Sequence, residues 1–146
     1  MNNIFDALRE SHEKQRLLMD ALLKTSGDSK SRREFYAQLK QELQLHAEAE
    51  ERNFYIPLIK KDSTIDMSRH GISEHHSIDK ILAQIDETDF DSPAWLTHMK
   101  SLQHQVLHHL EEEEQHIFQM AGKVIGDEQK QDLAAKYQQE MGESVH

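Results

Sequence analysis

Two histidines of this chain are each followed four residues later by a glutamate, and this spacing suits metal chemistry. The pairs are His46 with Glu50 and His109 with Glu113, and they stand 63 positions apart. The same step carries His12 onto His75. Positions four apart differ by about 40° around an α-helix, so each histidine points the same way as its glutamate. The pattern predicts a carboxylate-bridged two-metal centre with these six ligands: His12, His46, Glu50, His75, His109 and Glu113.

The two glutamates favour a metal centre over an ordinary polar contact. A lone histidine on an apolar face is usually a hydrogen-bonded core residue, and one His-x-x-x-Glu can be a simple helix side-chain pair. However, Glu50 and Glu113 fall in the middle of apolar stripes, where an unpaired buried carboxylate costs several kcal/mol. A pair of dications removes that cost. A purely structural, metal-free bundle stays as the alternative.

The apolar stripes also indicate which of two adjacent histidines points inward. Apolar side chains of the last long segment cluster within roughly 80° of His109, whereas His108 lies about 160° from the centre of their stripe. By the same argument His75 points inward and His76 outward. The remaining candidates are expected on the surface or at the rim of the site: Glu51, Glu114, His70, His76, His98, His104, His108, His116 and His146.

Two residues near the predicted ligands each have two interpretations. Tyr55 falls on the helical face of Glu51, so ligation by its phenolate would require a local distortion near Pro57. Gly71 lies one turn before His75, where it would either leave a small gap beside the metals or allow a close helix contact. The sequence favours neither interpretation of Gly71.

Four amphipathic segments are available to position these ligands. Apolar periodicity predicts long helices over residues 3–24, 31–59, 63–85 and 93–120, and a shorter, more polar helix over 128–141 packed outside them. Ser92 is expected to cap the fourth helix, with Pro93 at its first position. Short connections imply antiparallel neighbours. The predicted fold class is therefore all-α: an up-down-up-down antiparallel four-helix bundle with a short C-terminal fifth helix.

Composition is consistent with this fold and narrows the possible partners. The 146 residues suit a single domain spanning residues 1–146, and the chain has only five Gly and two Pro. A net charge of -10 without a Lys/Arg stripe argues against nucleic acid and membrane surfaces as partners. Because there is no Cys, thiolate sites are excluded, and a cytoplasmic location is expected. We find no apolar segment of signal or membrane-spanning length.

The candidate ligands and their neighbours resemble a known family over nearly the whole chain. The residues that carry the resemblance are His12, residues 46–51 with Phe54 and Tyr55, Glu74 with His75, and residues 109–114 with Ile117 and Phe118. Together they are similar to the hemerythrin-like, or HHE cation-binding, domains. The resemblance implies a four-helix bundle around two iron ions with an oxo or hydroxo bridge, which the glutamates also bridge. Manganese is the less favoured metal.

One departure from the family's oxygen carriers affects the expected activity. Those carriers have a fifth histidine four residues after the position of His75, and this chain has Asp79 there. With four histidines shared evenly, one coordination position would stay open on each iron. We therefore expect a small diatomic or peroxide ligand, with catalase-like peroxide decomposition as the favoured activity.

Other functions stay open at this stage. Non-catalytic binding, sensing or storage of oxygen, nitric oxide or iron is the alternative, and no protein partner can be named. Ferritin-like oxidases are a rival within the metal class, but they need Glu-x-x-His repeats on separate helices, and within the four long predicted helices this chain has only Glu113 to His116. A zincin is excluded because His-Glu-x-x-His is absent from the sequence.

Overall fold

The computed structural model describes residues 3–145, and no strand occurs among them. Four long helices form the body of the molecule: α1 (Ile4–Leu23), α2 (Lys30–Glu50), α4 (Ile65–Asp86) and α5 (Pro93–Glu112). Short π-helical turns, η1 (Glu51–Tyr55) and η2 (Glu113–Ile117), connect α2 to α3 (Ile56–Ile59) and α5 to α6 (Phe118–Gly122). The last helix is α7 (Asp127–Val145). The predicted all-α fold is confirmed, while His146 lies outside the described residues.

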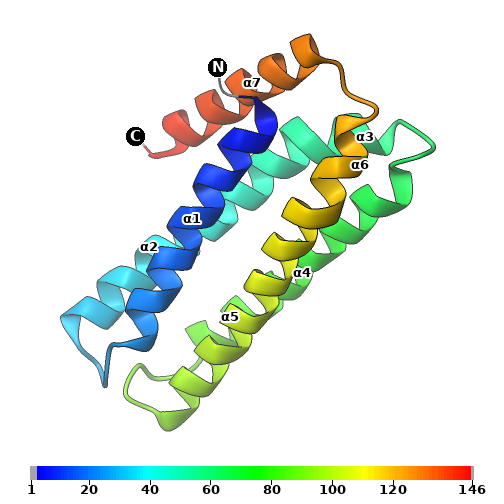
Figure 1. The fold of residues 1–146 in the computed structure, drawn as a ribbon. Coiled ribbons are helices and arrows are strands. Elements are labelled where there is room, and N and C mark those ends of the chain that lie inside the picture. The colour runs from blue at the N-terminus through cyan, green and yellow to red at the C-terminus, as the bar shows by residue number, and fades with distance from the viewer. Residues whose placement is uncertain (1–2, 146) are drawn as a thin grey trace.

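The long helices form two antiparallel hairpins that pack into a bundle. Figure 1 shows α1 beside α2 and α4 beside α5, with both hairpin turns at the same end of the molecule. The fifth helix, α7, crosses the opposite end and packs against α1, α2 and η1. It is longer than the predicted 128–141. Within residues 3–145, every helix is too short or too polar to cross a membrane.

Local capping explains where the helices begin. Asn3 and Asp6 form a capping box at the start of α1, in which each side chain accepts a hydrogen bond from the other residue's backbone N–H. The Ser92 hydroxyl accepts a hydrogen bond of 3.2 Å from the backbone N–H of Ala94, and Pro93 is the first residue of α5. The predicted cap of the fourth helix is therefore confirmed.

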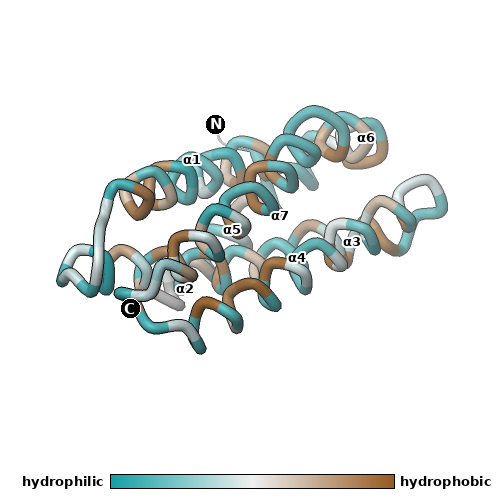
Figure 2. The backbone as a smooth tube through the Cα atoms, turned by 90° about the horizontal axis from the view of Figure 1, so that it is seen from below, coloured by the Kyte–Doolittle hydropathy of each residue, from teal (hydrophilic) through white to brown (hydrophobic). Residues whose placement is uncertain are grey.

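The buried apolar side chains form two clusters separated along the bundle. One cluster, at the end covered by α7, includes Phe5, Leu8, Phe54, Phe118 and Tyr137. The other, toward the hairpin turns, includes Met19, Leu39, Leu82, Trp95 and Leu102. Figure 2 shows how hydrophobic and hydrophilic positions alternate along each helix, as an amphipathic bundle requires. Between the two clusters lies a layer of inward-facing polar side chains, which are removed from water on both sides.

Candidate metal centre

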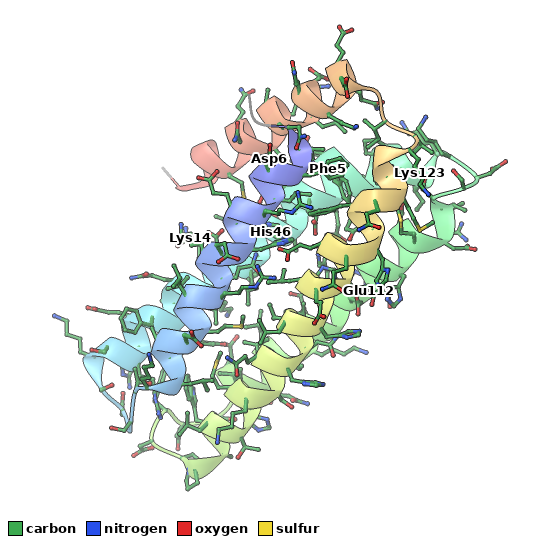
Figure 3. The ribbon with its side chains drawn as sticks, in the orientation of Figure 1. Phe5, Asp6, Lys14, His46, Glu112 and Lys123 are labelled. Atoms are coloured by element: carbon green, nitrogen blue, oxygen red, sulfur yellow. The ribbon has the colours of Figure 1, made fainter. Side chains whose placement is uncertain are left out.

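The polar layer contains all six residues predicted as metal ligands. One comes from α1 (His12), two from α2 (His46 and Glu50), one from α4 (His75), one from α5 (His109) and one from η2 (Glu113), and none is more than 3% exposed. Figure 3 shows His46 within the space enclosed by the helices, about midway along the bundle. As predicted, His76 and His108 are exposed. The four helices therefore bring together side chains that are up to 101 positions apart in the sequence.

The six residues divide into two overlapping groups of four. His12 and His46 belong to one group, His75 and His109 to the other, and the two glutamates belong to both; the ligand atoms within each group lie within 4.8 Å of one another. The Nε2 atom of His12 lies 3.1 Å from Glu113 Oε1, and that of His75 lies 3.0 Å from Glu50 Oε1. Neighbouring ligand atoms on a metal with bonds of 2.0–2.2 Å are about 3 Å apart. The spacing therefore suits one cation in each group, with both carboxylates between them.

Unpaired buried atoms are the strongest sign that cations belong here. The Nε2 atoms of all four histidines have no hydrogen-bond partner of acceptable geometry among the described residues, and neither do three oxygens of the two glutamates. Buried polar groups are nearly always paired, and an unpaired buried carboxylate is especially costly. A donor set of imidazole nitrogens and carboxylate oxygens fits iron or manganese. The residues present therefore fit a two-metal centre.

Two carboxylates outside the ligand set orient ligand histidines. His12 Nδ1 donates a hydrogen bond of 2.7 Å to Glu114, and His109 Nδ1 donates one of 2.7 Å to Glu74. Arg16 also donates two hydrogen bonds to Glu114. Such contacts favour the proton on Nδ1, so that the Nε2 lone pair would be free to bind a metal between the helices. Sequence reasoning placed Glu114 only at the rim and gave Glu74 no role; their adjacency to Glu113 and His75 was the available signal.

The fifth helix also reaches the site. Tyr137 on α7 lies with its hydroxyl 2.7 Å from His46 Nδ1 and 2.6 Å from the Ser11 hydroxyl. If His46 Nε2 faces the metal, Nδ1 carries the proton and donates to the Tyr137 oxygen, while the phenol donates to Ser11. The sequence pattern predicted an outer, mainly polar helix here and gave no sign of this contact. Only the docking of α7 across the bundle places Tyr137 here.

The π-helical turn η1 directs Tyr55 into the site. A π turn holds one extra residue, so the residues after it rotate by one position relative to a regular α-helix. Tyr55 therefore leaves the outer face predicted for it, is fully buried, and donates a short hydrogen bond to Glu113. Burial and the nearby Glu113 carboxylate raise the pKa of Tyr55 well above its ordinary value. The distortion that sequence analysis required for Tyr55 to approach the metals is thus present.

Gly71 makes room for this tyrosine. A Cβ atom built at Gly71 would lie 2.3 Å from Cζ of Tyr55, which is far inside van der Waals contact. Of the two interpretations of Gly71, the close contact is confirmed, and the ring of Tyr55 occupies the space that would otherwise be a gap. Gly71 is therefore explained by packing around the tyrosine.

We expect Gly71→Ala to destabilise the protein by about 1–3 kcal/mol, because the added methyl group overlaps the Tyr55 ring. The matched control is Gly142→Ala in α7, where a Cβ would meet nothing within 4 Å. This control should leave stability unchanged or raise it by up to about 1 kcal/mol through helix propensity. Urea unfolding of the three proteins measures both effects. Equal stability of the Gly71→Ala variant and the parent would contradict the packing described here.

A small cavity adjoins the histidines on the side away from Tyr55. Its volume is about 10 Å³, and it is lined by Gln15, Leu43, His46, Ala47, His75, Ile78, Asp79 and His109. This is room for about one water-sized molecule. Gln15 is 1% exposed, and its Nε2 has no partner among the described residues. Sequence analysis missed Gln15, although its position one turn after His12 places both on one helical face.

The carboxylates hold protons on the histidines when no metal is present. Burial disfavours the imidazolium of His12, but the nearby Glu113 and Glu114 carboxylates raise its pKa to about 8. Burial likewise disfavours the imidazolium of His75, but the nearby carboxylates, Glu50 foremost, together have the larger effect and raise the pKa of His75 to about 9. Burial alone would raise the pKa of Glu50, yet the surrounding histidines lower it well below its ordinary value. Protons thus supply the positive charge that cations would otherwise bring.

Metal binding is therefore expected to release protons and to strengthen as the pH rises. The pKa values of His12 and His75 exceed the unfolded value of 6.5, so their protonation stabilises the metal-free fold below pH 6.5. That contribution is lost as the pH rises through about 8 to 9. Because the pKa of His109 is also raised well above its ordinary value, calorimetric titration with metal at pH 7, in buffers of different ionisation enthalpy, should show release of at least about two protons. Heats that do not depend on the buffer would contradict this expectation.

Comparisons with known proteins agree with this architecture. A family model described as hemerythrin HHE cation binding domain matches residues 3–121. The crystal structure of a hemerythrin HHE cation binding domain-containing protein from Mycobacterium kansasii has the same fold, with a TM-score of 0.87 at 22% identity over 99% of this chain and 88% of that one. A curated protein of Nostoc sp., named DNA nickase, is 26% identical over 135 residues. This match spans 92% of the present chain and 38% of the Nostoc protein. The chain belongs to the hemerythrin HHE cation-binding domain family.

Proposed function

We propose that the polar layer holds two iron ions joined by an oxo or hydroxo bridge, and that manganese is the less favoured occupant. His12 and His46 would bind one iron, His75 and His109 the other, while Glu50 and Glu113 bridge the two. The observation that carries this proposal is the set of buried, unpartnered Nε2 and carboxylate atoms that lie close to one another in the interior. Family membership supports cation binding.

We further propose that the centre acts on oxygen, peroxide or nitric oxide, with peroxide decomposition as the favoured activity. The cavity beside the histidines admits only a very small molecule. Two irons would supply Lewis acidity and redox equivalents. Two H₂O₂ give two H₂O and one O₂, so the reaction needs no outside electron donor. Asp79, which stands where the carriers' fifth histidine is expected, lines this cavity and supplies no imidazole to close an open position.

Iron analysis and an oxygen electrode test the proposal directly. The iron-loaded protein should be coloured, contain two irons per chain and release oxygen when peroxide is added, while the metal-free protein should release none. A colourless protein that takes up no iron would overturn the di-iron proposal. A di-iron protein that releases no oxygen, but reversibly binds oxygen or nitric oxide, would instead support the alternative of binding, sensing or storage.

Gln15 is expected to recognise the small ligand, because its buried amide donor reaches the cavity and lacks a partner. Gln15→Leu should raise the dissociation constant for azide, a small anionic probe of an open iron position, by about three- to tenfold, as loss of one hydrogen bond implies. Gln38→Leu, at an exposed position on α2, is the control and should leave the constant unchanged. Spectroscopic titration of the iron-loaded proteins measures the constants. The same constant in all three proteins would exclude this role for Gln15.

We propose that nucleic acid is not a partner and that the location is cytoplasmic. The net charge of -10 supports the first statement, because it repels phosphate backbones. The absence of cysteine is compatible with the second. The Nostoc protein is named a DNA nickase, but only 38% of its length matches this chain, so the match does not assign DNA binding to the matched part. A gel-shift assay with duplex DNA at low salt would show retardation if the first statement were wrong.

A further inference from the structure

A second set of metal-ligating side chains lies outside the candidate centre, on the flank where α4 packs against α5. It consists of His70 and Glu74 on α4 and His108 and Glu112 on α5, which we call the outer quartet. On each helix the histidine precedes the glutamate by four positions, as in the interior pairs. On α5 the outer pair is displaced by one residue from His109 and Glu113, so it faces outward. Sequence analysis assigned both histidines of the quartet to the surface.

Three of the four side chains, His70, Glu74 and Glu112, converge closely enough to share one ion, and His108 stands beside them. His70 Nε2 lies 2.7 Å from Glu112 Oε1 and 3.6 Å from Glu74 Oε1, while His108 Nε2 lies 3.3 Å from Glu112 Oε2 and 3.7 Å from Glu74 Oε2. Ligand atoms at the corners of a tetrahedral zinc site are about 3.3 Å apart. Ligand atoms of His70, Glu74 and Glu112 all lie within 4.8 Å of one another. Each carboxylate faces both imidazoles, so a cation held by His70, Glu74 and Glu112 would also lie beside His108.

Solvent reaches the outer quartet directly, in contrast to the interior centre. The side chains of His70 and His108 are 53% and 61% exposed. Glu112, labelled on α5 in Figure 3, also lines a surface pocket of about 350 Å³ with His108, Glu111, Gln115 and His116. The interior ligands are at most 3% exposed. Metal ions in solution can therefore reach the outer quartet directly, whereas the interior ligands are closed off from solvent.

Glu74 joins the outer quartet to the interior. Its Oε1 accepts the hydrogen bond from His109 Nδ1, and its Oε2 faces His108. One carboxylate therefore contacts a predicted interior ligand on one side and the outer imidazole on the other. Movement of Glu74 toward an outer cation would loosen His109, whose Nε2 faces the interior centre.

We propose that the outer quartet binds one divalent transition-metal ion from solution and serves as the acquisition site for the interior centre. Its mixed nitrogen and carboxylate donors suit Zn²⁺ and Fe²⁺ rather than Mg²⁺ or Ca²⁺, which prefer oxygen ligands alone. Exposed ion pairs contribute little to stability, so pairing alone does not explain why two imidazoles and two carboxylates gather here. The binding part of the proposal is independent of the proposed function, whereas the acquisition part rests on it.

Zn²⁺ titration of the full chain in competition with a chromophoric chelator tests binding. The iron-loaded protein should take up one further Zn²⁺, and the His70→Ala, His108→Ala double variant should take up none. The control is the His98→Ala, His104→Ala double variant, which removes two other α5 histidines and should still bind one. The proposal is wrong if the parent binds no further Zn²⁺ or if the quartet variant binds as much as the parent. The same titration of the metal-free parent separates this proposal from the proposed function. The parent should bind three ions if the interior takes two, and one ion if only the outer quartet binds metal.

The rate of iron loading tests acquisition. Under anaerobic conditions, Fe²⁺ incorporation should be several-fold slower in the quartet double variant than in the parent, and the final iron content should be equal. Glu74 is left intact because it orients His109 and its loss would disturb the centre itself. Equal loading rates would overturn the acquisition role. A lower final iron content would also overturn the acquisition role, since it would show that His70 and His108 affect how stably the interior centre holds iron.

Discussion

Replacing Glu113 with alanine is expected to abolish stable iron binding at both positions of the centre. Glu113 belongs to both groups of candidate ligands, so its loss would remove one donor from each proposed iron position at once. The methyl group of alanine also leaves the Nε2 atoms of His12 and His109 without the carboxylate that now faces them. Iron content measured by elemental analysis should fall from two ions per chain to near zero, and the visible absorption should disappear with it.

Iron content of the Glu113→Ala variant can be compared with that of the parent because the variant is expected to fold. Without metal, alanine removes the carboxylate that faces protonated His12 and accepts a hydrogen bond from Tyr55, but the apolar clusters on both sides of the polar layer are unchanged. Circular dichroism should therefore show the same helix content as the metal-free parent. Glu111→Ala is the matched control, since this neighbour on α5 is exposed and lies outside both ligand groups. Undiminished iron in the Glu113→Ala variant would rule out a bridging role for Glu113.

Removal of the metals from the intact protein is expected to lower its melting temperature by about 10 °C or more. Cations bound in the polar layer would pair the four Nε2 atoms and the glutamate oxygens that otherwise stand unpartnered in the interior. Their loss leaves several buried polar groups unsatisfied, and protonated histidines restore only part of the balance. Thermal unfolding of iron-loaded and chelator-treated protein at pH 7 measures the difference.

Two further measurements distinguish the loss of metal from damage to the protein by the chelator. The Glu113→Ala variant, which should carry no metal, ought to melt at the same temperature with and without chelator. Adding Fe²⁺ back to the treated parent under anaerobic conditions should restore its original melting temperature. Identical melting temperatures of the iron-loaded and the metal-free parent would mean that cations do not stabilise the polar layer, and the prediction would be wrong.

Much of the site could be predicted because helical geometry is local. A helix turns by about 100° per residue, so the sequence alone shows which side chains share a face. This was enough to separate His109 from His108 and His75 from His76, and their burial confirms each choice. The glutamates within apolar stripes supplied the chemical argument, since a buried carboxylate requires a positive partner.

The contacts around the ligands could not be predicted, because they depend on departures from regular helix or on docking between helices. Tyr55 reaches Glu113 only because η1 adds a residue to the turn, and no periodic pattern reveals where a π turn occurs. Tyr137 reaches His46 only because α7 crosses the end of the bundle. Gly71 had two meanings in the sequence, and the position of the Tyr55 ring decided between them.

By itself, the sequence determined the helices, their inward faces and the six side chains brought together by those faces, because each of these follows from short-range periodicity and the cost of burying charge. Tertiary structure decided what holds those six residues in place. Glu74, Glu114 and Tyr137 each contact a ligand histidine from another helix. Such contacts depend on the distances between helices, and hydrogen bonds require the partner atoms to meet within a few tenths of an ångström, a precision that helical periodicity does not provide.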